Sequence, residues 1–205
     1  MDVLYLRATE PADYLLEDSV IDHTHPEVVR QAARLREGRP EDTDFAKVAF
    51  EFVRDNISHS WDAKDPRVTL SASDVLRQGV GLCYAKAHLL AGLLRAQGVP
   101  TGLCYQRLTD DGEQFDVHGL TAVYLDGAWH RQDPRGNKPG VDAQFSLTKE
   151  RLAWPVRPKL GECDYLELFA SPHAAVVEAL GSTDDVLSLC GGGLPAALPD
   201  ATPSR

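Results

Sequence analysis

The sequence predicts an α+β fold in which N-terminal helices pack on an antiparallel β-sheet. Up to Pro100, apolar residues recur mostly at helical spacing. After Pro100 they alternate with a period of two, which is typical of half-buried strands. Asp126-Gly127 then provides a strong signal for a two-residue hairpin turn. Helices that come first and strands that follow favour segregated layers over alternating β–α units.

The length of the chain predicts one domain. Its 205 residues can bury one sizeable core, and a second full domain is not expected. We assign residues 1–190 to that domain. The three glycines at 191–193 and the Pro/Ala-rich end predict a flexible C-terminal tail over 191–205.

Composition and charge argue against several classes of partner. The net charge is −10, with 31 acidic and 21 basic residues, so we expect no nucleic-acid partner. No run approaches the ~18 apolar residues of a membrane span, and no membrane partner is expected. The N-terminus lacks the pattern of a signal peptide, so we expect free thiols in the cytoplasm. The four cysteines lack zinc-ligand spacing, and they are Cys83, Cys104, Cys163 and Cys190.

Two helices are expected near the start, after a poorly patterned stretch over residues 1–22. The first begins with proline at its first position, Pro26, and ends at Gly38. His23-Thr24-His25 also resembles a metal-binding pair, but His25-Pro26 favours a helix start, and we expect no metal site. The second helix covers about 43–56, where apolar residues recur at helical spacing.

A loop and a short helix follow. Residues 57–66 predict a loop, and Ser71-Ala72-Ser73-Asp74 predicts a capping box for a helix over 73–78. Gly79 and Gly81 then allow a tight turn into the most distinctive stretch of the chain.

That stretch begins at Cys83 and is mostly apolar and helix-forming. Gly98 and Pro100 end it in the usual manner of a helix C-terminus. A thiol in the first turn of a helix lies at the positive end of the helix dipole, which favours the thiolate. Cys83 is therefore a candidate nucleophile, although a buried cysteine that only packs is the plain alternative.

The second half predicts three strands and then short helices. The strands are expected over 101–108, 117–125 and 128–132, and helices are expected over 146–153, 171–180 and 184–190.

A nucleophilic thiol needs a base, and the hairpin chooses between two histidines. If Leu125 pairs with Ala128 across the turn, His118 shares a sheet face with Asp133. The two would be diagonal neighbours within side-chain reach. His130 would lie on the opposite face. Each residue has a plain alternative when taken singly, because His118 could be a surface residue and Asp133 could terminate the strand. Their shared face favours a Cys–His–Asp triad.

Several of these pieces together resemble a transglutaminase-like domain of the bacterial cysteine-hydrolase kind, within the broad papain-like fold. The resemblance covers about 44–136 and is carried by Ser73–Leu76, Gly79–Cys83, the helix end at 89–100, His118, Tyr124–Trp129 and Asp133-Pro134. It implies Cys83 as nucleophile, His118 as base and Asp133 as orienting carboxylate. Two positions depart from the family pattern, because Gly119-Leu120 replaces Ala-Trp after the histidine and Arg135 replaces a frequent threonine.

The expected activity is a hydrolase that cleaves a peptide or amide bond through a thioester, without a cofactor. A transamidase or acyltransferase with an amine acceptor would use the same three groups. A non-catalytic binding module on the same fold is a third hypothesis.

Other residues are candidates for contacts with the substrate. Trp61, Tyr84 and Arg135 are expected to bind it, and Tyr84 and His88 lie close to Cys83 along its helix. The backbone N–H of Cys83 is one expected oxyanion donor. Trp61 or His59 is a candidate for the second.

Overall fold

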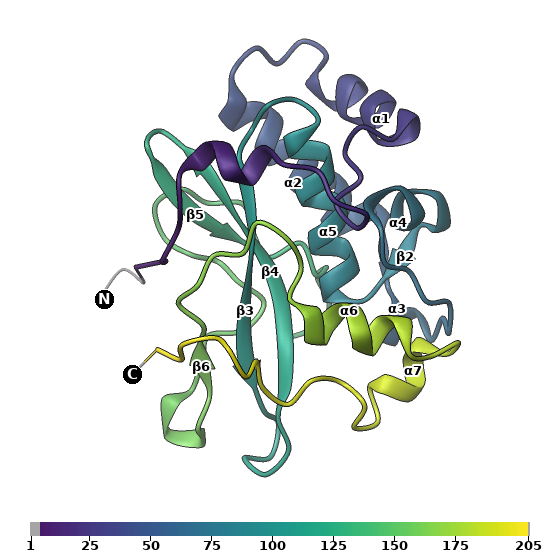
Figure 1. The fold of residues 1–205 in the computed structure, drawn as a ribbon, viewed down its shortest axis with the longest axis vertical. Helices are drawn as coiled ribbons and strands as arrows, with labels where there is room; N and C mark the ends of the chain where they lie inside the picture. Colours follow the sequence, from purple (N-terminus) through teal and green to yellow (C-terminus); the bar gives the residue numbers. More distant parts are fainter. Residues whose placement is uncertain (1–4, 205) are drawn as a thin grey trace.

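A computed structural model describes residues 5–204 as a four-stranded antiparallel sheet with helices against it (Figure 1). The elements are α1 (Pro26–Arg36), α2 (Asp42–Asn56), β1 (Ser58–His59), α3 (Ser60–Ala63), α4 (Ala72–Gln78), β2 (Val80–Gly81), α5 (Cys83–Arg95), β3 (Thr101–Leu108), β4 (Asp116–Leu125), β5 (Ala128–Gln132), β6 (Cys163–Asp164), α6 (Ala174–Gly181) and α7 (Val186–Leu189). The α+β prediction is confirmed.

The sheet has the strand order β5-β4-β3-β6, and β1 and β2 form a separate parallel pair. The predicted bounds of β3 and β5 agree with the structure, and β4 begins one residue before the prediction. These strands were predictable because alternation and the Asp126-Gly127 turn are both local signals. The pairing of β1 with β2 matters for the site, since it places His59 beside Gly81, two residues before Cys83.

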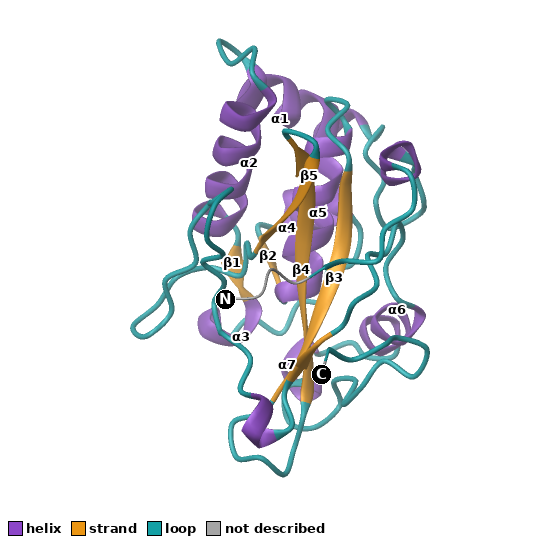
Figure 2. Cartoon of the chain, turned by 90° about the vertical axis from the view of Figure 1, so that its left-hand side faces the viewer, coloured by secondary structure: helices purple, strands orange, loops and turns teal. Residues whose placement is uncertain are grey.

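Helix α5 lies at the centre of the molecule, and all of its residues are buried. It packs on β4 and β3, while α1, α2 and α4 pack around it (Figure 2). Gly92 allows the approach of α4, because a Cβ there would lie 2.7 Å from the Cβ of Ala72. Each fully buried leucine of α5 contributes roughly 1.5–3 kcal/mol to stability. This packing fixes the position of the first turn of α5.

Helix caps account for two of the predicted starts. The Nδ1 atom of His25 accepts a hydrogen bond from the N–H of Glu27 at 3.3 Å, so His25 caps α1. Ser71 caps α4 by accepting from the N–H of Asp74 at 3.2 Å. Among residues 5–204, no helix is long and apolar enough to cross a membrane.

The other face of the sheet is covered by the N-terminal segment and by the stretch around Leu168. Tyr14 is buried there and meets Trp129 edge to face, with ring centroids 4.7 Å apart. The segment expected to be a tail runs beside β6 (Figure 1), where the N–H of Ser204 donates to the carbonyl of Asp164 at 2.7 Å. Leu198 of the same segment is buried on the α5 side of the sheet, in the cluster that contains Cys83 and Tyr84.

Two local predictions are wrong. The stretch 57–66 is not all loop, because it contains β1 and α3. Residues 146–153 form no helix. The side chain of Gln132 instead binds both the carbonyl and the N–H of Ser146, at 2.9 and 3.3 Å, and these are tertiary contacts that a local pattern does not reveal.

Candidate active site

Cys83 is the first residue of α5 and is 9% exposed. The turn before it requires glycine at position 81. A Cβ there would lie 2.8 Å from the Cβ of Ala85 and 2.9 Å from the Oγ1 of Thr69. The glycine thus lets the chain enter α5 tightly, and the thiol is presented from the first turn as predicted.

The hairpin has the predicted register. Leu125 pairs with Ala128, and Val123 pairs with His130. Asp126 and Gly127 both have positive φ, at 52° and 77°, as a type I′ turn requires. His130 binds the carbonyl of Leu125 and does not line the cavity beside Cys83.

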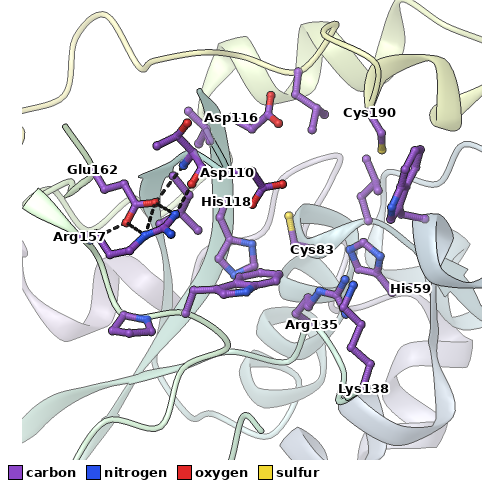
Figure 3. A pocket seen from close by; sticks show the side chains of 18 residues that line it. His59, Cys83, Asp110, Asp116, His118, Arg135, Lys138, Arg157, Glu162 and Cys190 are labelled. Carbon is purple, nitrogen blue, oxygen red and sulfur yellow. Dashed lines mark hydrogen bonds and ion pairs between the residues drawn. The ribbon is translucent and has the colours of Figure 1, made fainter. Parts of the chain in front are cut away.

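The same register brings His118 and Asp133 together. Their Nε2 and Oδ2 atoms are 2.9 Å apart. β5 pairs with β4 only as far as Thr121, which leaves the N–H of Gly119 without a β5 partner, while the N–H of Val117 donates to the carbonyl of Pro195. The N–H of Gly119 donates to the sulfur of Cys83 at 3.5 Å. Figure 3 shows the thiol beside the His118 ring.

Asp133 is a buried acceptor of three hydrogen bonds. Besides His118, its carboxylate accepts from the N–H of Ala153 at 3.0 Å and from the N–H of Arg135 at 3.1 Å. Burial raises the pKa of Asp133, but the charge and hydrogen bond of His118 and the two backbone bonds outweigh it, so the pKa is lowered. The group therefore remains a carboxylate and can orient the imidazole.

The environment of His118 favours the imidazolium. Burial disfavours the charged ring, but the charges and hydrogen bonds of Asp133 and Cys83 outweigh burial and raise the pKa of His118 to about 10. Trp154 covers the ring edge to face, with centroids 5.2 Å apart. A thiol beside an imidazolium in a shielded position is suited to nucleophilic catalysis.

These groups open into a cavity of about 620 Å³, which Cys83 and His118 line together with His59 and Trp61. Burial and the charge of Arg135 lower the pKa of His59 to about 3, so this ring is neutral near neutral pH. Trp61 is 52% exposed and lies at the start of α3, so it is available to a ligand.

Arg135 also lines the cavity but is held in place by the protein. Its guanidinium makes two hydrogen bonds to Asp62, at 2.5 and 3.1 Å, and lies over the ring of Trp154. Lys138 binds the same carboxylate at 2.9 Å. Burial raises the pKa of Asp62, yet the bonds to both cations lower it to about 2.

Two residues expected near the site lie outside the cavity. Tyr84 is buried, packs against Gly119 and donates its hydroxyl to the carbonyl of Val117. The Nδ1 atom of His88 lies 2.9 Å from the carbonyl of Leu70, also in the interior. Helical spacing predicted proximity to Cys83, but it did not predict that these side chains point into the core.

Sequence reasoning missed Trp154 and Cys190, which both line the cavity. No motif marks either, because long-range packing brings them there. Cys190 is a useful comparison for Cys83: burial and the Cys83 charge raise the pKa of its thiol to about 11. All four cysteines are free, and burial raises the pKa of Cys104 and Cys163 as well. Among residues 5–204, no three His, Cys, Asp or Glu side chains cluster as metal ligands would.

Known proteins resemble this chain in fold and, over about half of its length, in sequence. A solved structure of a candidate cysteine protease from Cytophaga hutchinsonii is 17% identical with a TM-score of 0.50, over 60% of this chain and 41% of that one. The periplasmic domain of TgpA from Pseudomonas aeruginosa is 18% identical with a TM-score of 0.46, over 62% of this chain and 48% of that one. This chain thus spans less than half of either protein. Among curated proteins, none matches significantly. The model of the Transglutaminase-like superfamily matches residues 29–134, slightly more than half of the chain. The chain therefore belongs to the transglutaminase-like superfamily.

Proposed function

We propose that this protein is a cysteine hydrolase that cleaves a peptide or amide bond through a thioester intermediate. The observation that carries the proposal is the arrangement around Cys83. Its sulfur accepts from the N–H of Gly119 at 3.5 Å, while His118 and Asp133 are joined at 2.9 Å beside it. Cys83 and His118 both line the cavity.

In the first step, the Cys83 thiolate attacks the carbonyl carbon and the carbonyl oxygen becomes an oxyanion. The N–H of Cys83, at the start of α5, is one donor to that oxyanion. We assign the second donor to His59. Its neutral ring lines the cavity, and β1 holds it beside Gly81. Trp61 is the more exposed of the two candidates and fits a substrate contact better.

In the second step, imidazolium His118 gives its proton to the leaving amine, and the C–N bond breaks to leave a thioester on Cys83. His118 then takes a proton from water, which attacks the thioester and releases the acid. An amine in place of water would give transamidation. Asp133 holds the ring orientation throughout and keeps its negative charge.

The compartment and the substrate contacts belong to the same proposal. Four free thiols favour a reducing cytoplasm. Arg135 is buried against Asp62 and Trp154, which hold its side chain in place. We therefore assign Arg135 to the wall of the cavity, where its fixed side chain contacts the substrate.

A first test is competitive alkylation with limiting iodoacetamide at neutral and mildly acidic pH, read by mass spectrometry at each cysteine. Cys83 should react faster than Cys190, which lines the same cavity and serves as the internal control. His118→Ala should remove that advantage. Equal rates at the two thiols would contradict the nucleophile assignment and favour the binding-module hypothesis.

A second test concerns the reaction itself. The wild type and Cys83→Ala are incubated with a fluorogenic peptide-amide library, and released amine is measured. The alanine variant should be inactive. For a substrate found in this way, added methylamine separates the two outcomes, because a transamidase yields increasing methylamide product and a hydrolase yields mainly free acid.

A further inference from the structure

Lys86 is a completely buried lysine that the proposed reaction does not use. It lies one turn after Cys83 on α5, on the same side of the helix. Its ammonium donates to the carbonyls of Arg54, at 3.3 Å, and Ile57. Those carbonyls belong to the last turn of α2 and to the residue that follows it, where helix carbonyls lack intrahelical partners.

The same ammonium also meets the turn that follows Asp133. Gly136 has φ of 111°, and a Cβ at this position would lie 3.3 Å from the Nζ of Lys86 and 3.4 Å from the carbonyl oxygen of Arg54. The turn therefore packs beside the ammonium, with little room for a side chain at position 136. Lys86 thus binds the end of α2 by hydrogen bonds and packs against the turn that follows Asp133.

Each of these segments carries part of the site. Helix α5 carries Cys83, and the turn before Gly136 carries Asp133. The end of α2 leads directly into β1, which carries His59. We propose that Lys86 is a positioning residue whose buried ammonium holds β1 and the Asp133 turn against the Cys83 helix. The proposal rests on the proposed function, because it assumes that Cys83 is the nucleophile.

The charges around Lys86 support an electrostatic contribution as well. Burial and Arg135 lower the pKa of Lys86 to about 7, while Asp133, Asp55 and Asp62 act in the opposite direction. The charge of Lys86 also acts on His59 of β1, whose pKa it lowers. A positive charge beneath the site favours negative charge within it, so we expect the pH profile of Cys83 alkylation to depend on Lys86.

Arg95 provides a matched control on the same helix. It is also buried, and its guanidinium donates to the carbonyls of Leu16, Thr101 and Ala170 at the far end of α5. Lys86→Met and Arg95→Met therefore both remove a buried cation from backbone carbonyls. Of these two residues, only Lys86 lies beneath the site.

The experiment measures the rate of Cys83 alkylation by iodoacetamide across a pH series, at a temperature where each variant is folded by circular dichroism. Lys86→Met should slow Cys83 about tenfold and move the acidic limb of the pH profile upward, whereas Arg95→Met should leave both unchanged. Lys86→Arg, which keeps the cation, should restore the position of the limb. Equal profiles for Lys86→Met and Arg95→Met would overturn the proposal.

Two further measurements keep the outcomes separate. If Lys86→Met does not fold, Gly136→Ala displaces the turn from the ammonium without removing charge, and an unchanged Cys83 rate in that variant would also overturn the proposal. If Cys83 of the wild type reacts no faster than Cys190, the proposed function fails, whatever Lys86 does.

Discussion

Asp133→Asn removes one charge from the site and leaves the shape of the side chain almost unchanged. In the wild type, Oδ2 accepts from His118 and from the N–H of Ala153, and Oδ1 accepts from the N–H of Arg135. An amide has one acceptor oxygen and one NH₂ group. Whichever way it is turned, its NH₂ faces a donor. The substitution must therefore break the bond to His118 or leave a buried N–H without a partner.

The magnitude follows from His118. Its pKa of about 10, against an ordinary value of 6.5, corresponds to about 5 kcal/mol of preference for the imidazolium. Asp133 supplies this preference together with the Cys83 thiolate, against the opposing effect of burial. Loss of the orienting carboxylate in a comparable triad lowers kcat by about 10⁴. We expect a fall in kcat/KM of that order here, with about 1–3 kcal/mol of lost stability from the unmade buried bond.

The assay is kcat/KM on the substrate found by library screening, with Cys83 alkylation as a second readout and urea unfolding as the stability measurement. Asp164→Asn is the matched control, since Asp164 is also buried and binds Arg131 and Gln106 away from the cavity. It should cost stability without changing the alkylation profile. A folded Asp133→Asn protein that retains more than about a tenth of wild-type kcat/KM would refute the reasoning.

Three further predictions follow from individual residues. Gly119→Ala places a Cβ 2.6 Å from the Cδ1 of Tyr84 and 3.2 Å from its Cα, so β4 must move away from α5. Unfolding experiments should show that the free energy of unfolding falls by about 1–3 kcal/mol. Alkylation of Cys83 should also slow. His59→Ala should lower kcat by about 10²–10³ with little change in KM, and a loss confined to KM would exclude the oxyanion role. The free energy of unfolding should respond to pH through two groups with opposite effects. Lys86 has a pKa of about 7 in the folded state against an ordinary value of 10.5, so it loses its proton more easily when the protein is folded. Its contribution to stability therefore increases as pH rises between these two values. His118 binds its proton more tightly in the folded state, so its contribution is complete below 6.5 and is lost as pH rises through about 10. Lys86→Met should therefore lose stability with rising pH more steeply than the wild type, and parallel curves would contradict this.

The sequence was sufficient for the His118–Asp133 pair because a two-residue turn fixes the register of a hairpin. Once Asp126 and Gly127 adopt positive φ, each later pairing is determined, and a strand alternates its faces without further information. The strand bounds follow from the same local rules. The placement of the thiol at the start of α5 was also local, because glycine and helix-end signals are carried by adjacent residues.

The remaining parts of the site depend on contacts between distant segments. His59 reaches the cavity because β1 pairs with β2, and a pair of two-residue strands has no recognisable pattern. Trp154 covers His118 from a segment without regular structure. Tyr84 was expected to contact the substrate, but α5 is buried on every side, so its sequence does not indicate which side faces the cavity.

The order of the site residues along the chain has a consequence for how the protein matures. Cys83 is synthesised before His118 and Asp133, and the N–H of Ala153, which binds Asp133, comes later still. The N–H of Gly119 reaches the sulfur only after β4 has docked against α5. A nascent or misfolded chain therefore carries an ordinary thiol, and the proposed nucleophile comes into existence with the tertiary structure. The alkylation rate of Cys83 should therefore report when the tertiary structure around this residue forms, which probes of secondary structure alone do not follow.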